Sequence, residues 1–273
     1  MEQNITSNDL QDALDGIINV LDKHKDKINT ERRMNQLVKY IFGGALTYAN
    51  GLKVLAREPE KGIWYQYDSM IPICRAFLEQ YPIVCKLIEL FPDEKLYDDY
   101  IKYLVILECV QDIKIFNSLK TDPTVESEAK RQESKQIHIN NWIDGIKNFF
   151  PNEVSHINEK RKEKSLKQII YNLSKKYDDK YKQDKNELIG NALQNNIAYK
   201  NNFGFAFRDA FQVYKLLCDE THSNIGAINI RSKYNGYISI NESNKNNGEA
   251  SVFTVMWCIK DIELRLYSLF QKI

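Results

Sequence analysis

The sequence predicts an all-α fold, a multi-helix bundle with a small β-ribbon near the C-terminus. Three observations lead to this prediction. Residues 68–91 carry apolar side chains on nearly every face of a helical wheel, which is typical of a helix buried all round. Apolar residues recur at helical spacing through most of the remaining chain. Proline and glycine are scarce, at 6 and 11 of 273 residues, so the composition is typical of a globular protein.

A chain of this length can form one large helical domain or two small ones, and we expect a single domain over residues 1–273. Four segments follow one another along it. They are an N-terminal helix (1–29), a helical core that contains an Arg/Glu helix (30–155), a basic exposed segment (156–185), and a C-terminal part with a His-bearing helix, the β-ribbon and a last helix (186–273).

The first two predicted helices cover residues 8–28 and 30–57, because leucine and isoleucine recur in both at helical spacing. Gly43 and Gly44 fall in the middle of the second helix. Glycine destabilises a helix interior relative to alanine. We therefore expect another helix to pass close to this point.

The central helix, residues 68–91, carries two charges inside its apolar pattern. Arg75 and Glu79 stand four residues apart and so share one face of the helix. A buried charge is costly unless it is paired and hydrogen-bonded. This face therefore meets polar partners or a cavity, and the pair is either a structural ion pair that fixes helix packing or part of a functional site.

Residues 93–120 and 124–150 are the next predicted helices, and Asp93 is expected to cap the first. Segment 156–185 has a different composition, with ten Lys and Arg against five acids and few large apolar residues. It is interpreted either as an exposed, solvated helix face or as an electrostatic patch for a phosphate backbone. The centre of the patch consists of Lys160, Arg161 and Lys162.

A short helix over residues 186–200 precedes the second informative stretch, residues 203–226. Here Tyr214 and Cys218 share an apolar face at helical spacing. His222 follows Cys218 by four residues, so the pattern predicts that it points inward from a helix end. An inward histidine is either a satisfied core residue or a catalyst.

The only strand signal lies after His222. Apolar and polar residues alternate over 234–240 around Asn235-Gly236, a dipeptide typical of a hairpin turn. The pattern predicts a small β-ribbon or an extended arm within residues 228–258. Residues 250–272 form the final predicted helix.

Composition excludes several classes of protein. Lys and Arg number 38 against 37 acids, which argues against a nucleic-acid footprint over the whole chain. We expect a cytoplasmic protein, because the N-terminus has no signal-peptide pattern and no apolar run is long enough to span a bilayer. The five cysteines form no CxxC pair and are expected to be free thiols in a reducing compartment. No nucleotide-binding or metal motif is present, so no cofactor or metal is expected.

Two patterns resemble known families. Arg131 and His138 enclose six residues, a spacing similar to that of the Arg and His in the HEPN superfamily of helical ribonucleases. Arg75-x-x-x-Glu79 on an early helix, with Tyr214 followed by His222-Ser223 on a late one, resembles the bacterial family DUF5677 (domain of unknown function). The glycine-bearing helix, Trp142 and the strand segment extend the second resemblance over roughly residues 30–270. That family is helical and distantly similar to HEPN-type proteins, several of which act in phage defence or toxin systems.

The resemblance implies a metal-independent ribonuclease or toxin-type effector. His222 would act as general acid/base on a ribose 2′-hydroxyl, Arg75 would stabilise charge on the phosphate, and Glu79 would orient either of them. Tyr214 and Asn224 would position the substrate. These three catalytic residues are then expected to meet in the fold.

The alternative is a non-catalytic helical module that binds a protein or a nucleotide. In it, Arg75, Glu79 and His222 would form an internal polar network. RNA, a protein encoded nearby and a second copy of the chain are the partners to consider, and no membrane is expected.

Overall fold

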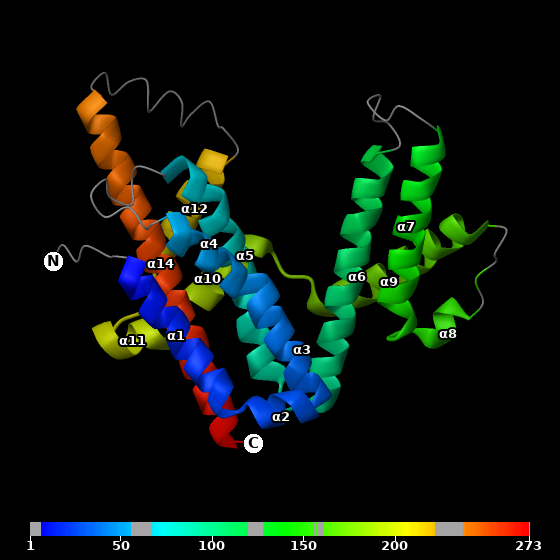
Figure 1. The fold of residues 1–273 in the computed structure, drawn as a ribbon, viewed down its shortest axis with the longest axis horizontal. Helices are drawn as coiled ribbons and strands as arrows, with labels where there is room; N and C mark the ends of the chain where they lie inside the picture. Colours follow the sequence, from blue (N-terminus) through cyan, green and yellow to red (C-terminus); the bar gives the residue numbers. More distant parts are fainter. Residues whose placement is uncertain are drawn as a thin grey trace. The chain divides into compact units, whose positions relative to one another are not determined.

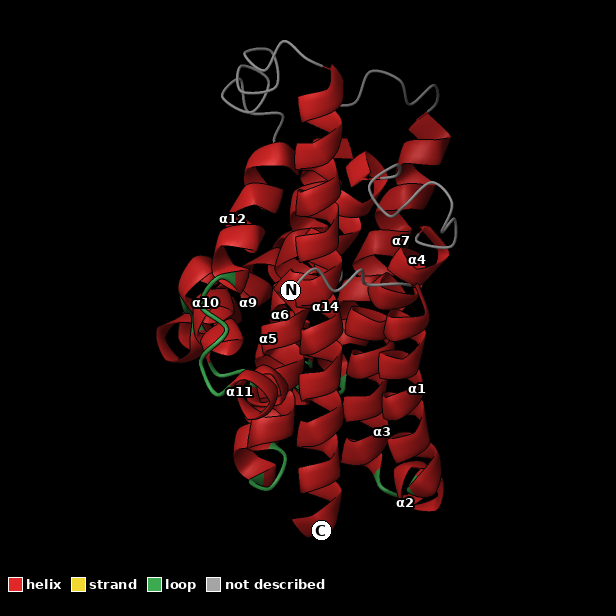
Figure 2. Ribbon diagram, turned by 90° about the vertical axis from the view of Figure 1, so that its left-hand side faces the viewer, coloured by secondary structure: helices red, strands yellow, loops and turns green. Residues whose placement is uncertain are grey.

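The computed structural model describes residues 7–55, 67–119, 128–155, 157, 161–221 and 237–272. All regular structure in these ranges is helical, and Figure 2 shows only helix and loop there. The predicted all-α class is therefore confirmed for the described chain. The helices are α1 (Ser7–Lys23), α2 (Lys25–Thr30), α3 (Arg32–Tyr40), the π-helix η1 (Ile41–Leu46), α4 (Thr47–Leu55), α5 (Tyr67–Leu90), α6 (Glu94–Leu119), α7 (Glu128–Lys147), α8 (Pro151–Val154), α9 (Lys162–Tyr181), α10 (Lys185–Gln194), α11 (Ile197–Phe203), α12 (Ala210–Thr221) and α14 (Tyr237–Lys272).

The helices form two compact units. The first comprises the described residues of 1–91 and 184–273, and in it α5 packs against α4, α10, α12 and α14 (Figure 1). The second comprises the described residues of 92–183, and in it α6 packs against α7 and α9. The second unit is thus inserted in the sequence between α5 and α10. That the two fold as the single domain expected from the sequence stays a prediction.

Helix α5 is the centre of the first unit. It runs unbroken from Tyr67 to Leu90 through Pro72 and Pro82. Its buried side chains point in several directions, as the apolar pattern predicted. They are Met70, Ile71, Cys74, Phe77, Leu78, Tyr81, Val84, Cys85, Leu87 and Ile88. The core of this unit is therefore built on the segment that the sequence marked as most apolar.

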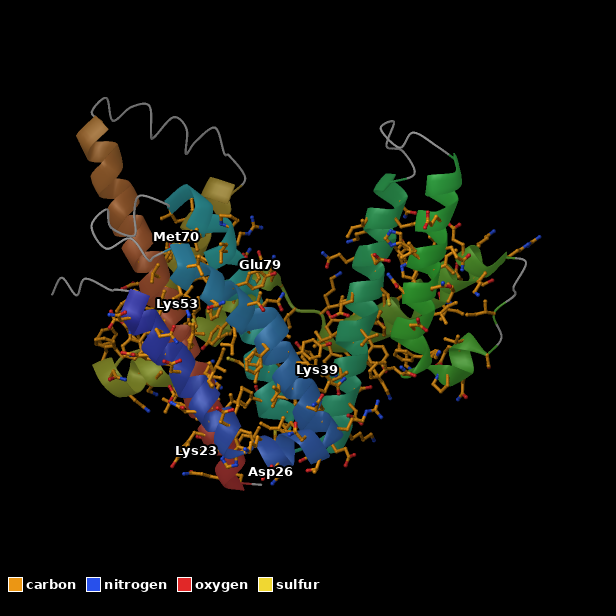
Figure 3. The ribbon with its side chains drawn as sticks, viewed as in Figure 1. Lys23, Asp26, Lys39, Lys53, Met70 and Glu79 are labelled. Carbon is orange, nitrogen blue, oxygen red and sulfur yellow. The ribbon has the colours of Figure 1, made fainter. Side chains whose placement is uncertain are left out.

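The N-terminal helices are more broken than predicted. The helix expected over 8–28 divides at His24 into α1 and α2, and the one expected over 30–57 contains η1 between α3 and α4. A Cβ on Gly44 would lie 3.3 Å from Gln80 Oε1 of α5, but one on Gly43 would meet nothing within 4 Å. The expected close approach therefore holds at Gly44 only. Helices α1 and α4 are joined by Lys53 (Figure 3), whose Nζ lies 2.6 Å from Gln11 Oε1.

The predicted β-ribbon is not seen. Residues 237–249 belong to α14, which runs from Tyr237 to Lys272. Residues 222–236, which include the Asn235-Gly236 turn signal, lie outside the described residues. A two-stranded ribbon is marginally stable in water, whereas adding residues to an existing helix needs no new nucleus. The short alternation of apolar and polar residues therefore determined the structure from Tyr237 onwards less strongly than continuity with the apolar helix that follows.

The segment expected to be basic and exposed is an amphipathic helix over most of its length. Helix α9 buries four side chains at helical spacing, Leu166, Ile170, Leu173 and Tyr177. It packs on these residues against α6 and α7. The basic segment that the sequence predicts to be exposed is therefore only partly exposed, because its lysines are interleaved with a narrow apolar stripe that composition alone conceals.

All five cysteines are free, four of them buried and Cys218 half-buried. No helix within the described ranges is long and apolar enough to cross a membrane.

Candidate functional site

Arg75 and Glu79, the charged pair of the central helix, form an ion pair on α5. Arg75 Nε lies 2.9 Å from Glu79 Oε1. Lys185, the first residue of α10, brings its Nζ to 2.6 Å from the same oxygen of Glu79, which is labelled in Figure 3. One carboxylate therefore holds two cations from two helices. The three groups together carry one net positive charge.

This pair is half-buried rather than enclosed. The side chains of Arg75 and Glu79 are 19% and 24% exposed. Burial lowers the pKa of Arg75, but the hydrogen bond and charge of Glu79 outweigh that effect, so the pKa lies above its ordinary value. Solvent thus reaches a guanidinium that stays ionised, which a site for an anionic ligand requires.

Tyr214 of α12 lies beside the same pair. Burial and the neighbouring Cys218 thiol raise the pKa of the Tyr214 hydroxyl, and the charges of Glu79 and Arg75 also act on it. Helix α12 packs against α5, which brings this tyrosine to the pair from a distant part of the sequence. The structure therefore places Arg75, Glu79 and Tyr214 together among the residues predicted for the site.

The predicted catalytic histidine cannot be added to this cluster. His222 and Asn224 lie outside the described residues, and α12 ends at Thr221, directly before His222. The meeting of His222 with Arg75 and Glu79 therefore stays a prediction.

The predicted basic patch belongs to the second unit. Lys160 lies outside the described residues. Arg161 is exposed and precedes α9 as its N-cap, and Lys162, the first residue of that helix, is half-buried. These residues do not belong to the unit that holds Arg75. A phosphate-backbone role for them stays a prediction.

A second polar group joins α6 to α7, and the sequence indicated it only through the spacing of Arg131 and His138. His138 Nδ1 lies 3.0 and 2.9 Å from the two carboxylate oxygens of Asp112. Trp142 Nε1 donates to Asp112 Oδ2 at 2.5 Å. The carboxylate is thereby held between two donors one turn apart on α7. The side chains of His138 and Asp112 are 16% and 29% exposed, so both remain within reach of solvent.

A lysine lies over the aromatic rings beside this pair. Phe116 contacts the rings of His138 and Trp142, with centroid distances of 5.5 and 5.3 Å. Lys167 of α9 places its Nζ 4.6 Å from the Phe116 centroid and 5.7 Å from that of Trp142. The same Nζ donates to Glu163 and Asn117, each at 2.9 Å. The imidazole thus contacts a carboxylate of α6 and the ring of Phe116, and the lysine that lies over Phe116 and Trp142 is itself paired with Glu163.

A third polar group is enclosed in the first unit, and the sequence reasoning missed it. The carboxylate of Asp261 is fully buried. It accepts from Tyr81 Oη at 2.7 Å, from the backbone N–H of Ile197 at 2.5 Å and from Arg265 Nε at 2.5 Å. Asn196 Nδ2 donates to Tyr81 Oη at 3.3 Å. Because these groups satisfy one another away from solvent, we assign this network to stability. The sequence did contain one indication of this network, because Asp261 and Arg265 stand four residues apart within an otherwise apolar helix.

Metal binding finds no support in the ranges that the structure covers, where no group of three or more His, Cys, Asp or Glu could hold an ion. No family model, curated protein or solved structure matches the chain.

Proposed function

We propose that this chain is a metal-independent ribonuclease whose acid/base group is His138, oriented by Asp112. The observation that carries the proposal is the contact of His138 Nδ1 with both oxygens of Asp112. A carboxylate on Nδ1 favours the tautomer that carries its proton there and leaves Nε2 as the base. Trp142 supports this geometry by donating to the same carboxylate from the other side. A positioned base of this kind is the central requirement of metal-independent RNA cleavage.

The surroundings of His138 support action on a phosphodiester. His138 Nε2 makes no hydrogen bond with any residue that the structure describes, so it is available to a substrate hydroxyl. Lys167, which is paired with Glu163, lies over the contacting rings and can donate to a phosphate there. Helix α9 carries six lysines against three acids, which favours attraction of a phosphate backbone to this unit. Arg131 stands seven residues before His138 on α7, about two helical turns away.

The chemistry follows from these roles. His138 Nε2 removes the proton of a ribose 2′-hydroxyl, and the resulting oxyanion attacks the adjacent phosphorus. Nearby cations stabilise the pentacoordinate phosphate. The bond to the 5′-oxygen then breaks, that oxygen takes a proton from water, and His138 releases the proton it gained to solvent. The products are a 2′,3′-cyclic phosphate and a 5′-hydroxyl end. The proposed setting is the cytoplasm of a bacterium, in a toxin or phage-defence role, as the family resemblance implies.

A second arrangement of the same chemistry uses the residues singled out in the sequence. His222 would be the acid/base, with Arg75, Glu79, Tyr214 and Asn224 around the substrate. The cluster of Arg75 and Lys185 on one half-buried carboxylate supports an anion site there. The arrangement with His138 has the stronger support, because its imidazole is hydrogen-bonded to the carboxylate of Asp112 that would orient it.

The test is cleavage of a labelled single-stranded RNA by the purified chain with and without EDTA. We expect cleavage in EDTA, and an about 10²–10⁴-fold loss of rate in His138→Ala and Asp112→Asn. His24→Ala is the matched control, because it removes a histidine from the other unit and should retain the wild-type rate. Loss of rate in His222→Ala but not in His138→Ala would move the chemistry to the Arg75 cluster.

Two results would contradict ribonuclease function. No cleavage by the wild type, alone or with the proteins encoded beside it, would leave the interaction module as the better description. Lower thermal stability of His138→Ala with an unchanged rate would make its pair with Asp112 a structural clamp between α6 and α7.

Neutralising Lys160, Arg161 and Lys162 should weaken RNA binding in a salt-dependent way and leave the rate at saturation unchanged.

A further inference from the structure

An aromatic cluster lies in the first unit, where α11 and the loop after it pack on α14. Tyr199 is at its centre, and its ring is parallel to that of Phe207 at a centroid distance of 3.9 Å. Trp257 of α14 closes the base of the cluster, 5.7 Å from Tyr199 and 5.2 Å from Phe203. Phe207 and Trp257 are buried at 4% and 6% exposed. The cluster is therefore anchored in the core of the unit.

Two rings of this cluster remain open to solvent. Phe203 is 40% exposed and Phe205 is 58% exposed, and their centroids are 6.2 Å apart. Gly204 between them adopts φ +75° as the C-cap of α11, a conformation that turns the chain so that both phenylalanines stay on the cluster. Contacts with Tyr199 hold both rings, at 4.5 Å for Phe203 and 5.6 Å for Phe205. Rings that are already ordered lose little entropy when a flat ligand covers them.

One positive charge contacts a ring of this cluster, and two more belong to the segment that carries the exposed rings. Lys260 Nζ is 4.8 Å from the Trp257 ring centroid. Lys200 and Arg208 are exposed residues of the same segment, one on α11 and one directly after Phe207. None of the three forms an ion pair with a residue in the described ranges. Exposed planar rings flanked by such cations match unpaired bases joined by phosphates better than they match an acidic or purely apolar surface.

A buried donor adds to this description. The indole N–H of Trp257 is buried and has no acceptor among the described residues. Buried donors are seldom left unpaired, and pairing one recovers the cost of its desolvation. A ligand acceptor that reached this N–H would therefore add to the affinity that the rings supply.

We infer that Phe203 and Phe205 form a stacking platform for unpaired bases of single-stranded RNA, with Lys200, Arg208 and Lys260 contacting its phosphates. The inference rests on the proposed ribonuclease function and names its substrate class as single-stranded rather than duplex RNA. Stacking on aromatic side chains tolerates any base, because every base has a planar face. The platform would therefore supply affinity without sequence preference.

The test is binding of a fluorescent 2′-O-methyl oligonucleotide of about 12 nucleotides to the full chain at low salt, about 50 mM. Such a probe lacks the 2′-hydroxyl nucleophile, so binding is measured apart from cleavage. We expect Phe203→Ala and Phe205→Ala each to weaken binding about 5- to 100-fold. Phe203→Leu should lose nearly as much, because leucine keeps apolar contact but removes the ring. Phe42→Ala is the matched control, since Phe42 is 43% exposed on η1 and should bind as the wild type does.

Several outcomes overturn the platform. They are wild-type affinity in Phe203→Leu, equal affinity of the wild type for a duplex of the same length, and no binding of the wild type to the single strand. Phe-dependent binding to phosphatidylserine vesicles without binding to the probe would instead identify a membrane surface. If His138→Ala abolishes cleavage but Phe203→Ala and Phe205→Ala bind the probe as the wild type does, the platform is overturned and the ribonuclease function is retained. Phe-dependent binding without any cleavage would support the platform and contradict ribonuclease function.

Discussion

Tyr81 donates its hydroxyl to the buried carboxylate of Asp261 at 2.7 Å, although 180 residues separate them in the sequence. The bond joins α5 to α14, two helices at the centre of the first unit. The same carboxylate accepts the backbone N–H of Ile197 at the start of α11. One acidic side chain thus connects three helices, including the helix that presents the aromatic cluster.

Replacing Asp261 should destabilise the first unit more than replacing either Tyr81 or Arg75. Asp261→Asn would leave Arg265 partly buried without its charge partner, so we expect a loss of about 3 kcal/mol in the free energy of unfolding. Tyr81→Phe removes one buried hydrogen bond and should cost about 1–2 kcal/mol. Urea denaturation measures both. Asp12→Asn, at an exposed carboxylate of α1, is the control and should stay within about 0.5 kcal/mol of the wild type.

The ion pair of Arg75 with Glu79 on α5 should contribute less to the free energy of unfolding than a fully buried pair would. Arg75→Ala leaves Glu79 partly exposed and still bound to Lys185, so we expect a loss of about 1 kcal/mol. Lys185→Ala alone should have a smaller effect. Because both cations share one carboxylate, the double variant should lose more than the sum of the single variants. A double-mutant cycle by thermal melting tests this, and strict additivity would show that Arg75 and Lys185 act on Glu79 independently of each other.

The stability of the second unit should depend on pH through Asp99. Burial raises the pKa of Asp99, but hydrogen bonds from Lys180 and Tyr181 outweigh that effect and hold it below its ordinary value. A carboxyl with a lowered folded-state pKa stabilises the fold above its unfolded-state pKa and loses that contribution as the pH falls through the folded value. Asp99→Asn should therefore lose about 1 kcal/mol at neutral pH, and the difference should shrink from about pH 4 downwards.

The adjacent exposed carboxylate offers a control for this experiment. Asp98→Asn should unfold near the wild-type urea midpoint at neutral pH, because Asp98 is exposed on α6. Urea midpoints measured across a pH series compare the two variants. Identical pH profiles for Asp99→Asn and Asp98→Asn would show that the bonds to α9 do not stabilise the ionised carboxylate.

Two glycines should respond to alanine with opposite signs. Gly204 has φ +75°, where a Cβ is strained, so Gly204→Ala should destabilise by about 1 kcal/mol. Gly248 lies within the helical backbone of α14, where alanine is favoured, so Gly248→Ala should stabilise by about 0.5–1 kcal/mol. Thermal unfolding measures both changes. A destabilised Gly248→Ala would contradict a regular helical backbone at this position.

Much of the secondary structure was predictable because its determinants are local. Helical spacing of apolar residues predicted α5 as a buried central helix, and Asp93 was correctly expected to cap α6, where it accepts the backbone N–H of Leu96 at 3.0 Å. The pairing of Arg75 with Glu79 was equally local, because residues four apart on a helix are neighbours whatever the helix packs against. The β-ribbon was wrong for a related reason. Alternation over a few residues does not say whether the chain there continues a neighbouring helix.

The remaining polar groups are set by tertiary contacts. Asp112 and His138 come from two helices and meet only when α6 and α7 pack, and Tyr81 reaches Asp261 only through the contact of α5 with α14. The stacking of Tyr199 with Phe207 depends on the left-handed turn at Gly204. Periodicity records which face of a helix is apolar, but it does not record which other helix covers that face. The partners of a polar side chain therefore follow from the packing of the whole unit, in which many contacts are satisfied together.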